Sequence, residues 1–320
     1  MRLLFISPKF NAYEELISRE LYSMDIKVDY FADKPQNLIY RIICFLSSSA
    51  KEYLDRAYLG KIIKFTKNYE YSHVLIIKGT ILNEEFMVAL RKIMPKAQFI
   101  MYQWDSTLTH NSYLKIIDFF DKVFTFDRKD SNLYKLEYLP LFYSGHYENL
   151  KKKPDSKFDL VFVGEFYPDS DRLEIIKKVA NYMEELGLNF YYSLRVEIFA
   201  LFKFLLFRHL RFKDLAYISI GRIPQEKVME LYANTIAVLD IEHIKQNGLT
   251  IRTMEVLGAG LKLITTNKNI IYEDFFSEKS IMVIDRQNIE MNTRFFDHDQ
   301  TLPINKKYSL KLWLSHILQF

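Results

Sequence analysis

The sequence predicts an α/β protein made of two successive doubly wound domains, and three observations lead to this fold class. Short apolar runs alternate with segments whose apolar residues recur at three- and four-residue spacing, which is typical of parallel strands joined by amphipathic helices. A charged stretch with a proline, ENLKKKPDSK at 148–157, interrupts the alternation, which starts again at Phe158. We therefore expect domains at 1–150 and 151–320, each with its own core, with the last helix a candidate for packing back on the first domain.

In the first domain, five apolar runs are expected to form the strands of a parallel sheet. A helix is expected between the third and fourth runs, where NEEFMVALRKIM at 83–94 places its apolar residues on one helical face. The predicted strands are RLLFIS (2–7), KVDYF (27–31), HVLIIKG (73–79), QFIMYQ (98–103) and KVFTF (122–126).

In the second domain, the same alternation continues. A helix over SDRLEIIKKVANYMEELG (170–187) ends at Gly187, a residue suited to the left-handed cap of a helix C-terminus. Two more helices are expected over PQEKVMELYANT (224–235) and TIRTMEVLGAG (250–260). The predicted strands are FDLVFVGE (158–165), LNFYYS (188–193), YISIG (217–221), TIAVLDI (235–241), LKLITTN (261–267) and SIMVID (280–285).

Composition argues against several classes of protein. A formal charge of +4 on 320 residues, without a recognition motif, argues against a nucleic-acid partner. The single cysteine, Cys44, permits neither an internal disulfide nor a cysteine metal site. The first residues read as a buried strand rather than a signal peptide. The apolar run at 197–207 is broken by Lys203 and is shorter than the roughly 20 residues of a membrane span, so we expect a cytoplasmic protein.

The stretch QNGLTIRTMEVLGAGLKLITTN holds three of the nine glycines of the chain. It reads as a loop, a helix capped by Thr250 or Thr253 and ended by Gly258 and Gly260, and a following strand, with Gly248 allowing close approach of the backbone to a ligand. The start of this helix would lie at the carboxyl ends of the strands, where doubly wound sheets bind ligands, and would offer free N–H groups to an anion. The stretch therefore predicts a phosphate site, with tight loop packing as the equally simple alternative.

Three segments of the second half resemble the donor-nucleotide domain of GT-B-fold glycosyltransferases: VFVGE…R, GRIPQEKVMELYANTIAVLDIE and QNGLTIRTMEVLGAGLKLITTN. The resemblance is to the bacterial polysaccharide and lipopolysaccharide branch that includes the CgeB-like proteins. SPKFNAYEELISREL…VDYF and YQWDS…FDKVFTFDRKD in the first half are similar to the same branch. The resemblance implies GT-B architecture, in which two Rossmann-like domains face a cleft, the first on the acceptor side and the second binding a nucleotide sugar.

The resemblance also assigns roles to single residues of the donor domain. Glu255 occupies the place of a glutamate that accepts hydrogen bonds from the ribose hydroxyls, and Gly164 matches the glycine at the end of the first strand. Many retaining members carry a second glutamate eight positions earlier, where this chain has Asn247. The carboxylate expected near the transferred sugar is therefore missing, and the choice between retaining and inverting chemistry stays open.

Further donor-binding residues follow from the same resemblance. Backbone groups of Gly248, Leu249 and Thr250 are expected to face the diphosphate or the sugar. Arg252 or Arg222 is expected to supply the positive charge that steadies the leaving nucleotide diphosphate. The alternative role of either arginine is an ordinary surface ion pair.

An inverting transfer needs a base that takes the proton of the acceptor hydroxyl. Asp105, just past a predicted strand in YQWDS, is the first candidate, and His110 is the second. Glu14 and Glu15, after the first strand, are weaker options. Capping of a following helix is the alternative role of Asp105.

Two acidic clusters invite comparison with metal sites. DSD at 169–171 has the form of the metal motif of the other glycosyltransferase fold, GT-A, but it precedes a predicted helix and is explained more simply by capping. DHD at 297–299 lies in a polar stretch without further ligands, and no HxxxH or HExxH spacing occurs. We predict no metal and no other cofactor. The signatures of P-loop kinases, GxSxG hydrolases and dinucleotide-dependent dehydrogenases are also absent from the sequence.

The segment RVEIFALFKFLLFRHLRFKD at 195–214 combines five basic and two acidic residues with many Phe and Leu. It reads either as a basic amphipathic helix that lies on an anionic membrane surface, or as a core helix whose basic residues face water. A glycosyltransferase that works on lipid-linked glycans would gain from the first arrangement.

Together these observations predict a cytoplasmic glycosyltransferase, peripheral at the inner face of the cytoplasmic membrane if the segment at 195–214 binds lipid. It would move a sugar from a nucleotide sugar to a bacterial surface polysaccharide, capsule or lipopolysaccharide, with a glycan or lipid-linked glycan as acceptor. The alternatives are a sugar-nucleotide epimerase of the same fold and a non-catalytic nucleotide-binding surface-assembly protein.

Overall fold

The computed structural model describes residues 1–10, 12–153, 155–297 and 302–319. The chain divides into two compact units. Unit 1 consists of Met1–Leu141 together with the helix that starts at Leu310, and unit 2 consists of Phe142–Ser309. Among the described residues, none of the helices combines the length and the hydropathy needed to cross a bilayer.

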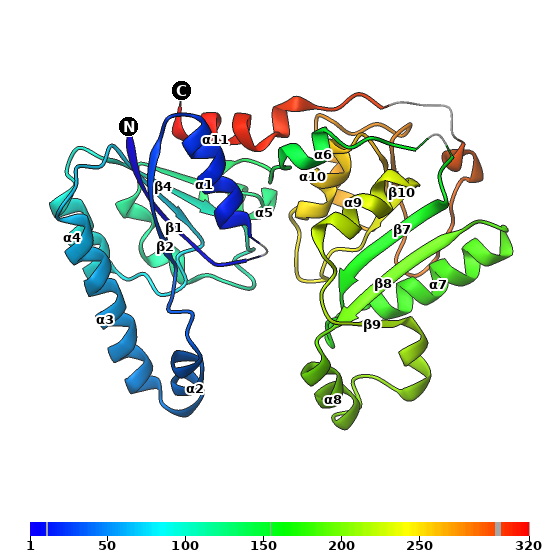
Figure 1. The fold of residues 1–320 in the computed structure, drawn as a ribbon, viewed down its shortest axis with the longest axis horizontal. Helices are drawn as coiled ribbons and strands as arrows, with labels where there is room; N and C mark the ends of the chain where they lie inside the picture. Colours follow the sequence, from blue (N-terminus) through cyan, green and yellow to red (C-terminus); the bar gives the residue numbers. More distant parts are fainter. Residues whose placement is uncertain (11, 154, 298–301, 320) are drawn as a thin grey trace. The chain divides into compact units, whose positions relative to one another are not determined.

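Unit 1 is built on a six-stranded parallel sheet with the strand order β2-β1-β3-β4-β5-β6 (Figure 1). Its strands are β1 (Arg2–Ser7), β2 (Lys27–Ala32), β3 (His73–Ile77), β4 (Gln98–Gln103), β5 (Lys122–Thr125) and β6 (Glu137–Tyr138). Its helices are α1 (Tyr13–Ser23), α2 (Leu38–Leu46), α3 (Ser48–Thr66), α4 (Glu84–Ile93), α5 (Arg128–Tyr134) and α11 (Leu310–Leu318), with 3-10 turns at Ser112–Lys115 and Ile117–Phe119.

Helix α4 shows how sequence specifies these elements. The Asn83 side chain caps its start by accepting a hydrogen bond from Phe86 N at 2.9 Å. Acidic residues occupy its first turn and basic residues its last turn, which complements the helix dipole. Phe86, Met87 and Leu90 are buried and join the core beside the sheet, so the amphipathic pattern at 83–94 predicts both the helix and its buried face.

Unit 2 is built on a second six-stranded parallel sheet, with the order β12-β11-β10-β7-β8-β9. Its strands are β7 (Phe158–Glu165), β8 (Phe190–Val196), β9 (Ile218–Ile220), β10 (Thr235–Asp240), β11 (Lys262–Thr265) and β12 (Ile281–Val283). Its helices are α6 (Gly145–Glu148), α7 (Arg172–Glu185), α8 (Ile198–Leu206), α9 (Gln225–Ala233) and α10 (Ile251–Gly258), with 3-10 turns at Phe212–Tyr217, Lys268–Tyr272, Thr293–Phe296 and Lys306–Tyr308.

The predicted fold class, two doubly wound parallel α/β units, is confirmed. In each sheet the chain first adds strands on one side of the first strand, β1 or β7, and then continues on its other side. The strand order therefore reverses at that strand, as in a doubly wound fold. The reversal lies between β1 and β3 in unit 1 and between β7 and β10 in unit 2. Ligands of such sheets bind outside the carboxyl ends of the strands at this reversal, and the candidate site is sought there.

The division between the units falls at Leu141–Phe142, before the expected boundary at residue 150. Tyr143 explains the difference, because it donates its backbone N–H to Tyr308 O at 3.0 Å and forms a bridge with Ser309, both in unit 2. Lys153, in the expected linker, donates its N–H to Ala233 O at 2.8 Å and so also belongs to unit 2. Helix α11 is part of unit 1, where Trp313 Nε1 donates to Pro140 O at 3.0 Å.

The segment at 195–214 does not form one long helix. Strand β8 runs to Val196, helix α8 covers Ile198–Leu206, and a 3-10 turn begins at Phe212. The interpretation of this segment as a core helix holds for one side of α8, where Leu201 is buried and Ala200, Phe204 and Leu205 pack against the core of unit 2. The other side of α8 exposes apolar side chains, with Phe199 86% exposed, together with the basic Lys203, and the exposed Arg208 follows the helix.

The two glycines at the end of α10 have different physical roles. Gly260 adopts a positive φ of 60° and ends the helix, with Leu261 N donating to Val256 O at 3.1 Å in a left-handed capping arrangement. Gly258 is inside the helix, and a Cβ placed on it would lie 2.3 Å from Tyr143 Cγ. Gly258 is therefore required by the close approach of an aromatic ring.

We predict that Gly258→Ala destabilises unit 2 by about 1–3 kcal/mol, because the added methyl group must displace the Tyr143 ring. Gly60→Ala is the matched control, since Gly60 lies within α3 and a Cβ placed on it would meet nothing within 4 Å. That change should stabilise the protein by about 0.5–1 kcal/mol through helix propensity alone. Denaturant unfolding of both variants checks this pair, and a stable Gly258→Ala protein would contradict the packing account.

Candidate functional site

The carboxyl ends of β7 and β10 meet at the strand-order reversal of unit 2 and carry the loops that lead to α7 and α10. Gly164 lies near the end of β7, where a Cβ would come within 2.6 Å of the Phe162 ring. A glycine here lets that ring lie against the strand end. The glycine position expected from the resemblance thus lies at this edge, and its local role is close packing.

Asp240, the last residue of β10, anchors the start of α10. Its buried Oδ2 accepts hydrogen bonds from Thr250 Oγ1 at 2.6 Å and from Thr253 Oγ1 at 2.8 Å. Thr250 caps the helix by accepting from Thr253 N at 3.3 Å. The first N–H groups of α10 are therefore held in a fixed position at the carboxyl edge of the sheet, as an anion site requires.

The loop before α10 is held by two asparagines that follow β11. Asn267 Nδ2 donates to Gly248 O at 3.2 Å, and Asn269 Nδ2 donates to Asn247 O at 2.9 Å. Leu249 is 3% exposed, and its buried side chain anchors the loop to unit 2. Because the carbonyl groups of Asn247 and Gly248 accept these hydrogen bonds, the backbone between Asn247 and Thr250 is held in one conformation.

Arg172, at the start of α7, is the first arginine after VFVGE, but the sequence alone gives it no role in the site. Its Nε donates to Ile241 O at 2.8 Å and its Nη1 to Glu165 O at 3.0 Å, so it joins the ends of β10 and β7. Burial lowers the pKa of Arg172, while the charges of Asp240 and Glu242 oppose this effect. The guanidinium donates to two neutral carbonyl groups, so no hydrogen-bonded carboxylate neutralises its charge in these contacts. A guanidinium of this kind at the start of a helix can bind a diphosphate.

Arg252 and Glu255 lie in a buried cluster with two tyrosines that the sequence does not reveal. Arg252 Nη1 donates to the Tyr232 hydroxyl at 2.7 Å. Burial acts to lower the pKa of Arg252, but Tyr232 and Glu255 raise it above its ordinary value. Burial and a hydrogen bond with Glu255 raise the pKa of Tyr147.

Arg222 is not brought to this cluster. It follows β9, at the edge of the sheet, and β8 separates that strand from β7. Its side chain is 81% exposed and forms an ion pair with Glu197 at 3.1 Å. The surface role named as the alternative is the one that the structure shows for Arg222.

The carboxylates of the DSD cluster are engaged by cations of unit 2. Asp169 contacts His243 at 3.3 Å and Lys245 at 3.1 Å, and Asp171 pairs with Arg286 at 2.6 Å. The cluster lies at the start of α7 as expected: Asp171 is its N-cap residue without a side-chain capping bond, and Ser170 Oγ accepts from Arg172 N at 3.2 Å. Across 1–10, 12–153, 155–297 and 302–319, no three His, Cys, Asp or Glu side chains gather as metal ligands. Within DHD, His298 and Asp299 lie outside the described residues.

In unit 1, both base candidates lie at the carboxyl end of the sheet. Asp105 Oδ2 contacts Lys78 Nζ at 2.6 Å, which joins the ends of β4 and β3. His110 is close to both groups. Burial and the Lys78 charge lower the pKa of His110, and Asp105 partly offsets this effect. His110 is therefore a neutral imidazole near pH 7, while the Asp105 carboxylate is engaged by an ammonium.

The capping role proposed for Asp105 is wrong, because the next regular segment starts at Ser112 after Asn111. Glu14 is buried and accepts from Phe10 N at 3.2 Å, so it serves the turn after β1. Glu15 faces solvent near Arg19, at 3.6 Å.

Two further polar residues, Asp33 and Gln103, lie at the carboxyl ends of strands of unit 1. Asp33, at the end of β2, is 1% exposed; its Oδ2 accepts from Thr80 N at 3.2 Å, and its Oδ1 has no partner among the described residues. Gln103 Nε2 donates to Lys78 O at 3.0 Å. Lys78 itself has a φ of 67°, a strained backbone of the kind that gathers at functional sites.

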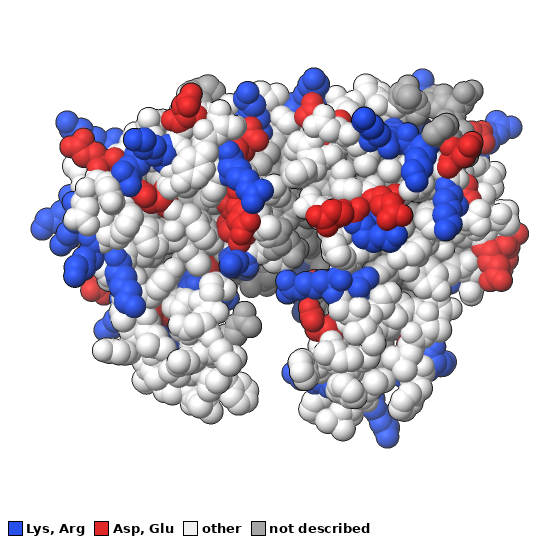
Figure 2. Space-filling view, in the orientation of Figure 1, with Lys and Arg blue, Asp and Glu red and all other residues white. Residues whose placement is uncertain are grey.

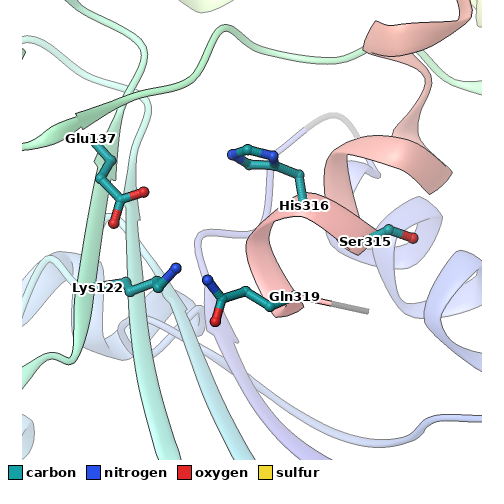
Figure 3. Close-up of a pocket in the computed structure, with 5 residues that line it drawn as sticks. All are labelled: Lys122, Glu137, Ser315, His316 and Gln319. Carbon is teal, nitrogen blue, oxygen red and sulfur yellow. The ribbon is translucent and has the colours of Figure 1, made fainter.

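A pocket of about 530 Å³ lies elsewhere in unit 1. Glu137 and Lys122 face His316 and Gln319 across it (Figure 3). Lys122 and Glu137 are the first residues of β5 and β6, so the pocket lies at the amino ends of these strands. Doubly wound sheets bind ligands at the opposite edge, and we do not assign this pocket to the site. Its lining residues are Lys122, Glu137, Ser315, His316 and Gln319.

No protein-family model matches the chain, and no curated protein matches it. Solved structures do. A glycosyltransferase from Rickettsia africae is similar with a TM-score of 0.56 at 12% identity, covering 90% of this chain and 84% of that one. OtsA in its apo form has a TM-score of 0.63 at 10% identity, covering 100% of each chain.

Anabaena Alr3699/HepE, determined with UDP and glucose, is similar with a TM-score of 0.52 at 10% identity, covering 89% of this chain and 86% of that one. At these identities the likeness concerns the fold. The chain therefore has the GT-B fold of these glycosyltransferases.

Proposed function

We propose that the protein is a glycosyltransferase that takes its sugar from a nucleotide sugar bound to unit 2. The observation that carries this proposal is the helix start at Thr250, tied to Asp240 at the strand-order reversal, with the half-buried Arg172 joining the ends of β10 and β7 beside it. A diphosphate matches this arrangement of fixed N–H groups and an arginine. UDP bound to HepE makes UDP-glucose the first donor to test.

Each donor-site residue has a role in this proposal. The backbone of Gly248, Leu249 and Thr250 contacts the diphosphate, and Arg172 and Arg252 supply positive charge as negative charge develops on the leaving group. Glu255 accepts hydrogen bonds from the ribose hydroxyls.

Asn247 bears on the stereochemistry. Its amide can hydrogen-bond to the transferred sugar but cannot act as a carboxylate, which supports an inverting transfer that depends on a base in unit 1. The same residue supports the second candidate function, a nucleotide-binding surface-assembly protein without turnover.

In unit 1, His110 takes the proton of the acceptor hydroxyl, and Asp105 stabilises the imidazolium that forms. This order of roles rests on the lowered pKa of His110 and on the contact of Asp105 with Lys78. A neutral imidazole can accept a proton near pH 7. The acceptor is a glycan or lipid-linked glycan of a bacterial surface polysaccharide or lipopolysaccharide, the class that the sequence resemblance implies.

Helix α8 and the turn after it form a peripheral contact with an anionic membrane. The support is the exposure of Phe199 and Phe202 beside the exposed Lys203, Arg208 and Arg211, a composition suited to the interface of an anionic bilayer.

For the donor site, we predict that Glu255→Ala weakens UDP binding by about 1.5–3 kcal/mol, the range for a hydrogen bond to a charged group. The variant should also lose the preference of the wild type for UDP over 2′,3′-dideoxy-UDP, because the ribose hydroxyls lose their acceptor. Calorimetry measures both. Arg222→Ala is the control and should bind like the wild type, since Arg222 is exposed at the sheet edge. Retained discrimination by a folded Glu255→Ala protein would contradict the assignment.

For the base, we predict that His110→Gln lowers turnover by two to four powers of ten, roughly the contribution of general-base catalysis. Because the pKa of His110 is lowered from 6.5, the wild-type rate should persist below pH 6.5 and fall only as the imidazole becomes protonated. Asp105→Asn should move this acid limb to still lower pH, since Asp105 raises the pKa of His110.

Glu15→Gln, at an exposed ion pair, is the control for the base variants and should leave the pH profile unchanged. A large loss in Asp105→Asn together with a near-normal His110→Gln protein would instead make Asp105 the base.

For the membrane contact, we predict that binding to phosphatidylglycerol vesicles falls as salt rises, because charge attraction is screened within a Debye length of about 8 Å at physiological ionic strength. Lys203→Gln/Arg208→Gln should remove most of this salt-sensitive part. Vesicle sedimentation measures it, and an unchanged salt dependence in the double variant would argue against α8 as the anionic contact.

A further inference from the structure

We propose that α2 is a second lipid-binding element, by which unit 1 inserts apolar side chains into the interface of a bilayer. This proposal stands independently of the glycosyl-transfer proposal.

Every exposed side chain of α2 that the structure describes is large and apolar. Five large side chains on this nine-residue helix are each between 50% and 90% exposed, although fully burying one such side chain is worth about 1.5–3 kcal/mol. A continuous exposed patch of this kind marks an interaction surface. The five are Leu38, Ile39, Ile42, Phe45 and Leu46.

The exposure of this face is built into the local structure. Asn37 caps α2 by accepting from Tyr40 N at 2.7 Å. The buried Tyr40 donates its hydroxyl to Asp55 Oδ1 at 2.6 Å, and Lys51 pairs with Asp55 Oδ2 at 2.6 Å. Asp55 belongs to α3, whose Leu59 and Ile62 join the core of unit 1. The helix is therefore fixed to the sheet layer with its apolar side turned outward.

A bilayer surface is the occupant that fits the charge and the length of α2. The helix contains no acidic residue, and Lys34 and Lys51 flank it in sequence. Figure 2 shows the surface around this end of unit 1 largely in the white of uncharged residues. Nine residues span about 14 Å, half of the hydrocarbon thickness of about 30 Å, so α2 can lie in the interface but cannot cross it.

The position of α2 in the topology supports the same occupant. It follows the second strand of unit 1, and α8 follows the second strand of unit 2. Both helices begin just beyond the carboxyl end of their strand (Figure 1), the edge where each unit carries its candidate site. A lipid surface needs no sequence-specific complementarity, so it can bind two helices that share exposed aliphatic and phenylalanine side chains and that each contain one basic residue, Arg41 in α2 and Lys203 in α8.

The test distinguishes membrane binding by α2 from membrane binding by α8 through the salt concentration and the charge of the lipid. Sedimentation with neutral phosphatidylcholine vesicles at high salt suppresses the electrostatic contribution of α8. Under these conditions the wild type should still bind, and Ile39→Ser/Phe45→Ser should lower the partition coefficient by about tenfold or more. Leu133→Ser is the matched control, because Leu133 is 64% exposed on α5 of the same unit, and it should bind like the wild type.

A direct reporter keeps the proposal falsifiable. Phe45→Trp retains an apolar side chain, and its fluorescence, compared with that of the wild type, should shift to the blue when phosphatidylcholine vesicles are added. Equal binding by the serine double variant and the wild type, or no blue shift, would overturn the proposal. Concentration-dependent dimerisation that the double variant abolishes, without vesicle binding, would overturn it in favour of a second copy of the chain.

Discussion

The pairing of Asp240 with the two threonines of α10 is the interaction on which the proposed donor site depends. One buried carboxylate oxygen accepts from both Thr250 and Thr253, and so joins the end of the central strand β10 to the start of the helix. Without it, the capping hydroxyl and the first N–H groups of α10 would lose their fixed position. A buried charge persists only when its hydrogen bonds are made, so the site and the stability of unit 2 share the same atoms.

Buried polar groups at the carboxyl edge of each sheet also need hydrogen-bond partners. Parallel strands bring the ends of sequence-distant segments together, and buried polar groups there must find partners among the loops. Arg172 joins two loops through neutral carbonyl groups and keeps its charge available for an anion. Lys78 joins two strand ends in unit 1 by pairing with Asp105, and this pairing leaves the neutral His110 better suited to accept a proton.

The strands could be predicted from the sequence because a strand buried on both faces must be a continuous apolar run; β1, β4 and β7 match their predicted bounds. The position of Asp105 beyond a strand was equally predictable. Arg172 was not, because its partner Ile241 is 69 positions away in sequence, and no local pattern reports such a contact. The exposed face of α2 was not predictable either, since its apolar residues have the same periodicity as a buried helix.

The central claim is that the start of α10 and Arg172 receive the diphosphate of a nucleotide sugar. The most direct measurement compares the affinities of UDP and uridine for the wild type and for Arg172→Gln by calorimetry. The account predicts that the wild type binds UDP at least about tenfold more tightly than uridine, and that Arg172→Gln loses most of this difference, since a charge-assisted hydrogen bond contributes about 1.5–3 kcal/mol. An equal preference for UDP in both proteins, or no preference in the wild type, would contradict it.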